Sequence, residues 1–354
     1  MITPKPQVLR YMFDRYLKKY LYLATMTIDC WDYTKGRYVA EGEYSYDGFS
    51  ATMCIGDRWQ TGYDEAHWFK KQVTVPEGLA GKPLRLELNI GGESLVKVNG
   101  VIRGSVTYGE QWQHREAIFI DTYNAGDVLD IEIEAAVNSG AFCDAAMDGA
   151  KQTEYQFRKA RLVAVDPVCE GYIYDLEVAF RALDFIKDEY IHAAVYRAID
   201  ESLHTVDFDF DEPRVRASIA NAAEVFADLL GQIKYTPQSE IILTSHSHID
   251  VAWLWRIQES VRKSARTFSN NIALMDLFPE MTFAQSQAVL YDMMKQHYPD
   301  IYERIKEKVR NGQWDVAGNV WVEADTNIAS GEALIRQTGV THSPGGYQKT
   351  VRWA

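Results

Sequence analysis

The sequence has few cysteines, no long apolar run and a shortage of positive charge. Its four cysteines, Cys30, Cys54, Cys143 and Cys169, lie far apart and form no C-x-x-C pair, which argues against a structural zinc knuckle. We therefore expect buried or incidental thiols in a reducing compartment. The opening MITPKP lacks the basic and apolar parts of a signal peptide, and no segment stays apolar for the thickness of a bilayer. These absences predict a cytoplasmic location away from membranes.

Basic residues are outnumbered, with 37 Lys and Arg against 50 Asp and Glu, which gives a net charge of -13. This balance disfavours nucleic acid and anionic membrane surfaces as partners and suits a neutral or cationic ligand. At 354 residues, with 47% hydrophobic and 25% charged residues, the chain has an ordinary globular composition. Its length is sufficient for more than one domain.

Short apolar runs that alternate with turns predict a β-sandwich of jelly-roll type over residues 38–165. A lead-in of residues 1–37 precedes it, in which mixed helical spacing predicts a helix over residues 10–24. Asn99 and Gly100 both tolerate the positive φ of a type I′ turn, so they predict a hairpin. The predicted strands cover residues 68–75, 84–90, 94–98, 117–120 and 128–135.

Aromatic residues of the sandwich offer a surface for sugar, because sandwiches of this type often bind carbohydrate through exposed rings. Packing between the sheets is the more frequent role of such rings. The residues concerned are Trp68, Tyr108, Trp112 and Tyr123. A non-catalytic carbohydrate-binding chain is therefore one alternative function.

Helical spacing of apolar residues predicts a helical linker over residues 166–237, interrupted by an acidic loop at residues 207–213. From residue 238 to residue 337, the order strand, helix, helix, strand predicts the first part of an α/β domain with a parallel sheet or barrel. Pro299 is expected to open one of its helices, and Gly312 to follow that helix. Another helix carries one apolar stripe of Val261, Ala265, Phe268, Ile272 and Met275.

The most informative segment is residues 245–253, SHSHIDVAW, which follows the apolar run at residues 241–243. It places His246, His248 and Asp250 at alternate positions, so a strand that continued into it would point all three side chains the same way. An Asp after a strand can also be a simple helix cap. Ligand sites of open α/β folds nevertheless lie where a strand ends before a helix, which favours metal binding or catalysis.

A second predicted strand, residues 314–322, ends at the sequence Glu-Ala-Asp, whose last residue is Asp325. Two strand ends of one α/β layer can converge on one site. Together His248, Asp250 and Asp325 offer one imidazole and two carboxylates, a mixture that suits zinc better than calcium or magnesium. A different metal-dependent hydrolase, such as an amidohydrolase, also uses His-x-His after a strand, but it needs further histidines at later strand ends.

Three ordered segments carry a family resemblance: residues 246–256 (HSHIDVAWLWR), 262–269 (RKSARTFS) and 321–327 (WVEADTN). They resemble the start of the catalytic domain of glycoside hydrolase family 38, the α-mannosidases. The resemblance spans residues 240–337 and is greatest for the bacterial and cytosolic branch, in which a β-sandwich and a helical segment precede the catalytic domain. It implies retaining, zinc-dependent hydrolysis of terminal α-linked mannose, with an α-mannoside oligosaccharide as substrate and Zn²⁺ as cofactor.

The resemblance also implies roles for single residues. His248 and Asp250 match the first two zinc ligands of the family, and Asp325 matches the aspartate that both touches zinc and attacks the anomeric carbon. Trp253 matches the aromatic residue on which the mannose ring stacks. His246 matches a neighbouring histidine that is not a ligand and helps to shape the site.

Two parts of the family site have no matching position in the chain: the fourth zinc ligand, a histidine, and the general acid/base aspartate. His342 does not resemble the family motif and is expected at the surface. A capped helix at residues 330–337 gives way to an atypical, unpatterned tail at residues 338–354. We expect a truncated or frame-shifted product with little activity, whose uncovered strand edges favour a homo-oligomer or misfolding.

Overall fold

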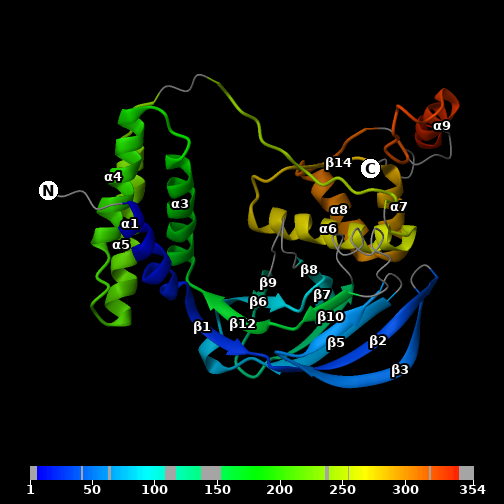
Figure 1. The fold of residues 1–354 in the computed structure, drawn as a ribbon, viewed down its shortest axis with the longest axis horizontal. Helices are drawn as coiled ribbons and strands as arrows, with labels where there is room; N and C mark the ends of the chain where they lie inside the picture. Colours follow the sequence, from blue (N-terminus) through cyan, green and yellow to red (C-terminus); the bar gives the residue numbers. More distant parts are fainter. Residues whose placement is uncertain are drawn as a thin grey trace. The chain divides into compact units, whose positions relative to one another are not determined.

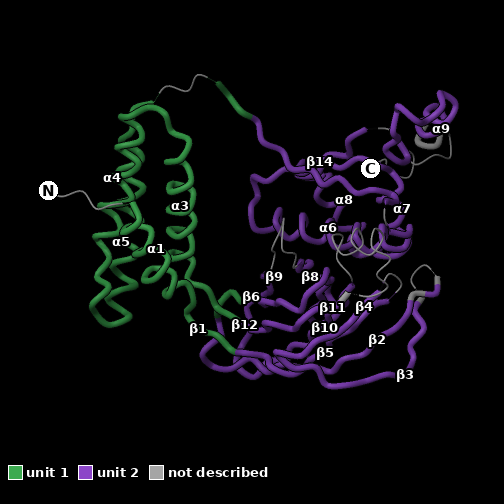
Figure 2. The backbone as a smooth tube through the Cα atoms, in the orientation of Figure 1, with its two compact units in different colours: residues 1–26, 82–84, 163–241 green, residues 27–81, 85–162, 242–354 purple. Residues whose placement is uncertain are grey.

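The computed structural model describes residues 6–40, 43–62, 65–107, 117–136, 153–235, 239–253, 255–318 and 320–342. The chain divides into two compact units, which Figure 2 distinguishes by colour. A helical unit comprises residues 1–26, 82–84 and 163–241, and a larger unit comprises residues 27–81, 85–162 and 242–354. The larger unit holds most of a β-sandwich and an α/β layer, so the predicted multidomain fold class is confirmed (Figure 1). Among the described helices, none combines the length and the apolar character needed to cross a membrane.

The helical unit contains α1 (Pro6–Arg15), η1 (Leu17–Tyr20), α3 (Pro167–Leu183), α4 (Glu189–Thr205) and α5 (Glu212–Gly231). Its helices pack around one apolar core, whose buried members include Phe13, Leu176, Ile199, Ile219 and Phe226. Figure 1 shows α3, α4 and α5 running side by side. The predicted helical linker is thus a packed bundle with its own core.

Aspartates begin three of these helices. The side chains of Asp166, Asp188 and Asp211 accept backbone N–H bonds at the starts of α3, α4 and α5, because the first N–H groups of a helix have no partner within it. Asp211 belongs to the acidic stretch 207–213, which separates α4 from α5 as predicted. Within this stretch, Asp211 caps the start of α5.

The predicted helix over residues 10–24 is wrong in its bounds. α1 ends at Arg15, η1 follows, and the chain is already extended in β1 (Tyr22–Thr27). Half-buried and exposed side chains alternate along β1. This period of two is typical of a strand, and the aromatic spacing of the preceding helix obscures it in the sequence.

The sandwich is built mainly from a four-stranded sheet, in the order β1-β12-β6-β9, and a six-stranded sheet, in the order β3-β2-β5-β10-β7-β8. The short strands β4 and β11 pair separately. Its further strands are β2 (Cys30–Ala40), β3 (Glu43–Cys54), β4 (Arg58–Thr61), β5 (Glu65–Thr74), β6 (Pro83–Asn89), β7 (Glu93–Val98), β8 (Val101–Thr107), β9 (Ala117–Thr122), β10 (Val128–Ala136), β11 (Thr153–Gln156) and β12 (Lys159–Val165). The short helix η2 (Glu77–Leu79) follows β5.

Each strand predicted between residues 68 and 135 is confirmed, with bounds that differ by a few residues. The hairpin between β7 and β8 is confirmed as well, since Asn99 and Gly100 have φ values of 52° and 76°. The strands before residue 38 were not predicted. Their burial depends on the opposite sheet, which is formed by residues distant in the sequence.

The cysteine prediction is wrong for two residues. Cys30 and Cys54 face each other in the register of β2 and β3 and form a disulfide. Cys169 is a buried free thiol, as expected, and Cys143 lies outside the described residues. The wide spacing of the cysteines gave no sign of the pair, because strand pairing brings the two residues together.

Of the four aromatic residues considered for sugar binding, Trp68 packs in the core of the sandwich. Trp68 is 6% exposed, and its ring contacts those of Tyr44 and Tyr46, with centroid distances of 5.1 Å in both cases. Tyr123 is half-buried, while Tyr108 and Trp112 lie outside the described residues. Trp68 is therefore a core residue and gives no support to a sugar-binding surface.

The α/β layer consists of a parallel sheet in the order β13-β14-β15 and of helices that follow its strands. The strands are β13 (Ser245–His246), β14 (Phe283–Gln285) and β15 (Trp314–Val316), and the helices are α6 (Ile257–Leu277), α7 (Ala288–His297), α8 (Pro299–Arg310) and α9 (Gly331–His342). The predicted apolar stripe of α6 is buried along its whole length. Pro299 opens α8, and Gly312 follows it with φ +80°, both as predicted.

Three boundaries in this layer differ from the predictions. Residues 241–243 are not in a strand, and Ile241, Ile242 and Leu243 are 78%, 87% and 86% exposed. β15 ends at Val316, well before residue 322, and α9 continues past Gln337 to residue 342. A strand persists only where a neighbour accepts its hydrogen bonds, and β13 and β15 are edge strands in the described sheet.

A buried group of ion pairs joins α6 to the β-sandwich. Glu93 on β7 lies 2.9 Å from Lys263 Nζ and 2.9 Å from Arg266 Nη2. Arg262 pairs with Glu134 on β10 at 3.1 Å. α6 directly follows the loop with the histidine motif, so these ion pairs hold in place the helix to which that loop is connected.

Candidate metal centre

The histidine motif begins at the carboxyl end of β13, beside the middle strand of the sheet. Ser245 donates its backbone N–H to the carbonyl of Thr282 at 3.1 Å, and Nδ1 of His246 lies 2.7 Å from the carbonyl oxygen of Ala284. His246 is thus oriented by β14, although its side chain is exposed. The chain then leaves the sheet and carries His248 and Asp250 in an irregular loop.

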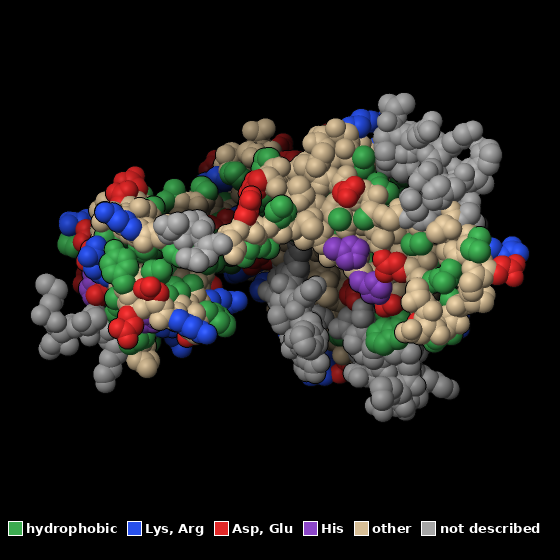
Figure 3. Space-filling view, turned by 90° about the horizontal axis from the view of Figure 1, so that it is seen from above, with side chains coloured by type: hydrophobic (Ala, Val, Ile, Leu, Met, Phe, Trp, Pro, Cys, Tyr) green, Lys and Arg blue, Asp and Glu red, His purple; other side chains and the backbone are tan. Residues whose placement is uncertain are grey.

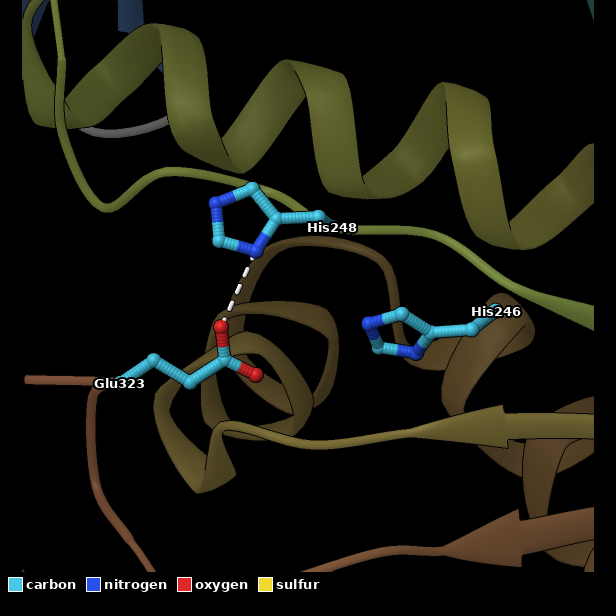
Figure 4. A group of neighbouring side chains, drawn as sticks. All are labelled: His246, His248 and Glu323. Atoms are coloured by element: carbon cyan, nitrogen blue, oxygen red, sulfur yellow. Dashed lines mark ion pairs between the residues drawn. The ribbon is translucent and has the colours of Figure 1, made fainter.

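His248 lies between two carboxylates. Its Nε2 is 3.1 Å from Oδ1 of Asp250. Its Nδ1 is 3.0 Å from Oε2 of Glu323, the ion pair that is dashed in Figure 4. The hydrogen bond with Asp250 raises the pKa of His248, and Glu323 acts in the same direction. The two carboxylates come from two different loops, one that follows β13 and one that follows β15, and Glu323 occupies the place in which Asp325 was predicted.

The donor atoms fit a divalent metal. Ligand atoms of His246, His248 and Glu323 lie within 4.8 Å of one another, in the only such group of three found among the described residues. Figure 4 shows His248 pointing toward the Glu323 carboxylate with the His246 ring beside them, and Figure 3 shows histidine side chains beside acidic ones at the surface. Imidazole and carboxylate together are typical zinc ligands.

Asp325 lies on the same loop as Glu323 but outside this group of three. Its side chain accepts the backbone N–H of Asn327 at 2.9 Å, and its carbonyl accepts those of Ile328 and Ala329. The carboxylate is exposed and caps a turn. Glu323 is a residue that sequence reasoning missed, although it stands at the same acidic strand end.

Trp253 lies in the loop between Asp250 and α6, 57% exposed, with its ring centroid 5.8 Å from that of Trp255. Trp255 donates its indole N–H to Ser260 Oγ at 3.0 Å, and Ser260 in turn donates to the carbonyl of Asp250 at 3.1 Å. The first turn of α6 therefore holds the loop that carries both Asp250 and Trp253. The Trp253 ring is exposed and follows Asp250 by three residues along the chain.

Two family models match the chain. Residues 238–343 match the glycosyl hydrolases family 38 N-terminal domain, and residues 25–163 match the jelly roll domain of alpha-mannosidase. The first range contains every residue of the candidate centre. The second corresponds to the β-sandwich.

Curated relatives agree with these matches. Alpha-mannosidase G of Dictyostelium discoideum is 31% identical over 278 residues, which are 77% of this chain and 25% of that protein. Alpha-mannosidase 2C1 of Homo sapiens is 31% identical over 280 residues, 76% of this chain and 26% of the relative. The alpha-mannosidase of Saccharomyces cerevisiae is 27% identical over 315 residues, 84% of this chain and 28% of the relative. The chain thus spans about a quarter of the length of these relatives.

Among solved structures, a β-glucuronidase of Faecalibacterium prausnitzii is 12% identical and covers 41% of this chain and 32% of its own, with a TM-score of 0.27. A score this low supports no argument about fold or function.

Proposed function

The chain belongs to glycoside hydrolase family 38 and corresponds to an N-terminal portion of that family's α-mannosidases, and we therefore propose that it serves the retaining, zinc-dependent hydrolysis of terminal α-linked mannose. The observation that carries the proposal is the His248 imidazole between carboxylates of two converging strand ends. The substrate is a mannose-terminated oligosaccharide or glycan. The matched domain argues against the amidohydrolase alternative.

His248, Asp250 and Asp325 are the proposed zinc ligands. His248 and Asp250 are already in contact, whereas the Asp325 carboxylate accepts the backbone N–H of Asn327 in the metal-free chain. Glu323, 3.0 Å from His248, is the carboxylate that takes part in the metal-free arrangement. When bound, zinc supplies a Lewis-acidic centre that adjacent cis hydroxyls of mannose can ligate.

Asp325 is the proposed nucleophile. Its carboxylate oxygen attacks the anomeric carbon while the bond to the leaving oxygen breaks, and a carboxylic acid protonates that oxygen. The conjugate base then activates water, which releases mannose and frees Asp325 with retained configuration. Trp253 is proposed to stack on the sugar ring, which holds the ring in place and excludes water from one face.

The family's general acid/base has no matching position in the sequence, so we expect the 354-residue chain alone to turn over an aryl α-mannoside very slowly. Any turnover should require zinc and should fall at least about 10³-fold in Asp325→Asn, because an amide oxygen is a poor nucleophile. Asp315→Asn, an exposed aspartate on β15, is the matched control and should change little. Turnover that survives Asp325→Asn would contradict the nucleophile assignment.

Sugar recognition can be tested separately from turnover. Cobalt in place of zinc gives a visible spectrum that depends on its ligands, and methyl α-mannoside should change this spectrum more than methyl α-glucoside. The difference is expected because only mannose presents cis hydroxyls at positions 2 and 3. Equal spectral changes with both sugars would contradict mannoside specificity.

We further propose a cytoplasmic location. Burial raises the pKa of Cys169 to about 12, which keeps this thiol protonated and unreactive. In a reducing compartment the Cys30–Cys54 disulfide of the structure would be reduced to two thiols. Alkylation during rapid cell lysis should therefore label both residues. A disulfide trapped in that experiment, or secretion of the protein, would contradict the proposed location.

A further inference from the structure

Gln287 lies between the two loops of the candidate centre and bonds to both. Its Nε2 donates to the carbonyl of Ile249 at 2.7 Å, and its Oε1 accepts the backbone N–H of Glu323 at 3.2 Å. Ile249 separates His248 from Asp250 in the first loop, and Glu323 is the acidic residue of the second. One side-chain amide thus connects the backbones that carry the metal-binding side chains.

The backbone of Gln287 departs from local preferences. Its φ is +65°, which is unfavourable for a residue with a long side chain and is shared by only one other non-glycine residue, Asn99, among those described. It also occupies the N-cap of α7, where Ser, Thr, Asp or Asn is usual, and its side chain makes no capping bond there. Local structure therefore does not explain a glutamine at this position.

The hydrogen bonds that join Gln287 to the two loops need both the NH₂ group and the carbonyl oxygen of a primary amide. Gln287 is 2% exposed, so the carbonyl of Ile249 and the N–H of Glu323 would be left without this partner if the side chain lost its polar atoms. Glutamate offers the acceptor but no donor, and leucine offers neither. Beside it, Ser286 donates to the carboxylate of Glu323, and the backbone N–H groups of Ala288 and Val289 donate to the carbonyls of Val320 and Trp321 in the second loop.

We propose that Gln287 is a positioning residue that holds the two strand-end loops at the separation required for metal binding. The inference rests on the proposed function in so far as zinc is the metal. Gln287 does not itself touch the metal. It keeps the backbones of Ile249 and Glu323 at a fixed separation, so the His248 imidazole already lies between the carboxylates of Asp250 and Glu323 in the metal-free chain.

Gln285 provides the matched control. It lies on the same strand end, is fully buried, and its Oε1 has no hydrogen-bond partner among the described residues. Its Nε2 donates only to the carbonyl of its neighbour Ser286. Gln285→Leu therefore removes a buried amide of the same size and leaves the hydrogen bonds from Gln287 to Ile249 and Glu323 in place.

Zinc affinity of the 354-residue chain is measured for wild type, Gln287→Leu, Gln287→Glu and Gln285→Leu. We expect zinc to bind Gln287→Leu at least about tenfold more weakly, the loss typical of groups that support metal ligands, and Gln285→Leu within about threefold of wild type. Gln287→Glu, which retains the acceptor, should lie between them and serves if the leucine variant does not fold. Equal affinities of the two leucine variants would overturn the proposal.

A metal-free measurement separates this inference from the proposed function. Hydrogen exchange at the backbone N–H of Glu323 should become at least about tenfold faster in Gln287→Leu, and stay unchanged in Gln285→Leu, since only the former loses the acceptor. Unchanged exchange at Glu323 would refute the role of Gln287. Failure of the wild-type chain to bind zinc would instead refute the zinc site, whatever the exchange rates show.

Discussion

His248 is the residue on which the candidate centre depends most. Each of its ring nitrogens faces a carboxylate, Asp250 on one side and Glu323 on the other, and the ring remains 58% exposed. An imidazole in such surroundings can exchange a proton for a metal ion without a change of position. The exposure of the ring leaves it open to a ligand from solution.

Replacement of His248 by Gln should weaken zinc binding at least about 100-fold, because an amide is a much poorer zinc ligand than imidazole. Calorimetric titration of the metal-free chain measures the change. His204→Gln alters an exposed histidine of α4 that pairs with Asp200, and it should leave the affinity unchanged. An effect of equal size in both variants would show that zinc binds elsewhere.

At the scale of elements, α6 links the candidate centre to the rest of the larger unit. Its first turn holds the Asp250 carbonyl through Ser260, its apolar stripe packs under the sheet, and its basic residues pair with the β-sandwich. Loss of its packing should therefore disturb the centre and the fold together. Two substitutions in these contacts separate the contribution of apolar packing to the stability of the fold from the contribution of the ion pairs.

Phe268→Ala should lower the free energy of unfolding by about 3–5 kcal/mol, since it leaves a cavity in a close-packed core. Phe268 is completely buried against Trp314 and Tyr291, with centroid distances of 5.2 and 6.0 Å. Urea denaturation measures the loss. Phe278→Ala, at the exposed end of the same helix, should cost less than about 1 kcal/mol. Similar losses in both variants would argue against the described packing.

Glu93→Gln should destabilise the chain by about 3 kcal/mol, because it removes the negative charge that the buried side chains of Lys263 and Arg266 both contact. Thermal unfolding at neutral pH is the measurement. Glu280→Gln, an exposed glutamate in the loop after α6, should have almost no effect. If Glu93→Gln is as stable as the wild type, the contact between α6 and β7 is not part of the folded state.

At the scale of the whole chain, a buried histidine links folding to pH. His67 on β5 is completely inaccessible, with Nδ1 2.7 Å from the Tyr33 hydroxyl and Nε2 3.6 Å from Glu65. Burial lowers the pKa of His67 more than the Glu65 carboxylate raises it. Below its ordinary pKa of 6.5, the histidine takes up a proton more readily in the unfolded chain than in the folded one.

The folded chain should therefore lose stability as the pH falls below about 6.5 toward the lower pKa of folded His67, since the unfolded state binds the extra proton. His67→Gln keeps a polar group near Tyr33 but has no proton to bind. The loss of thermal stability between pH 7 and pH 5.5 should be smaller in this variant than in the wild type. Equal losses in the two proteins would show that other groups account for the acid sensitivity.

The sequence alone was sufficient for features that depend on near neighbours along the chain. The strands of the sandwich, the turn at Asn99, the start of α8 at Pro299 and the apolar stripe of α6 follow from local spacing and backbone preference. The three ordered motifs also predicted the family, which the domain matches confirmed. The early strands and the ends of β13 and β15 were misjudged, because a strand extends only as far as its partner.

Only the tertiary structure brought together residues that the sequence keeps far apart. It placed Glu323 against His248, Gln287 between the two loops, Cys30 opposite Cys54, and the Asp325 carboxylate in a turn. A sequence motif specifies which donor groups follow the end of a strand. Their distances from one another depend on the paths of loops from separate strands, which side-chain packing and hydrogen bonds fix only when the chain has folded.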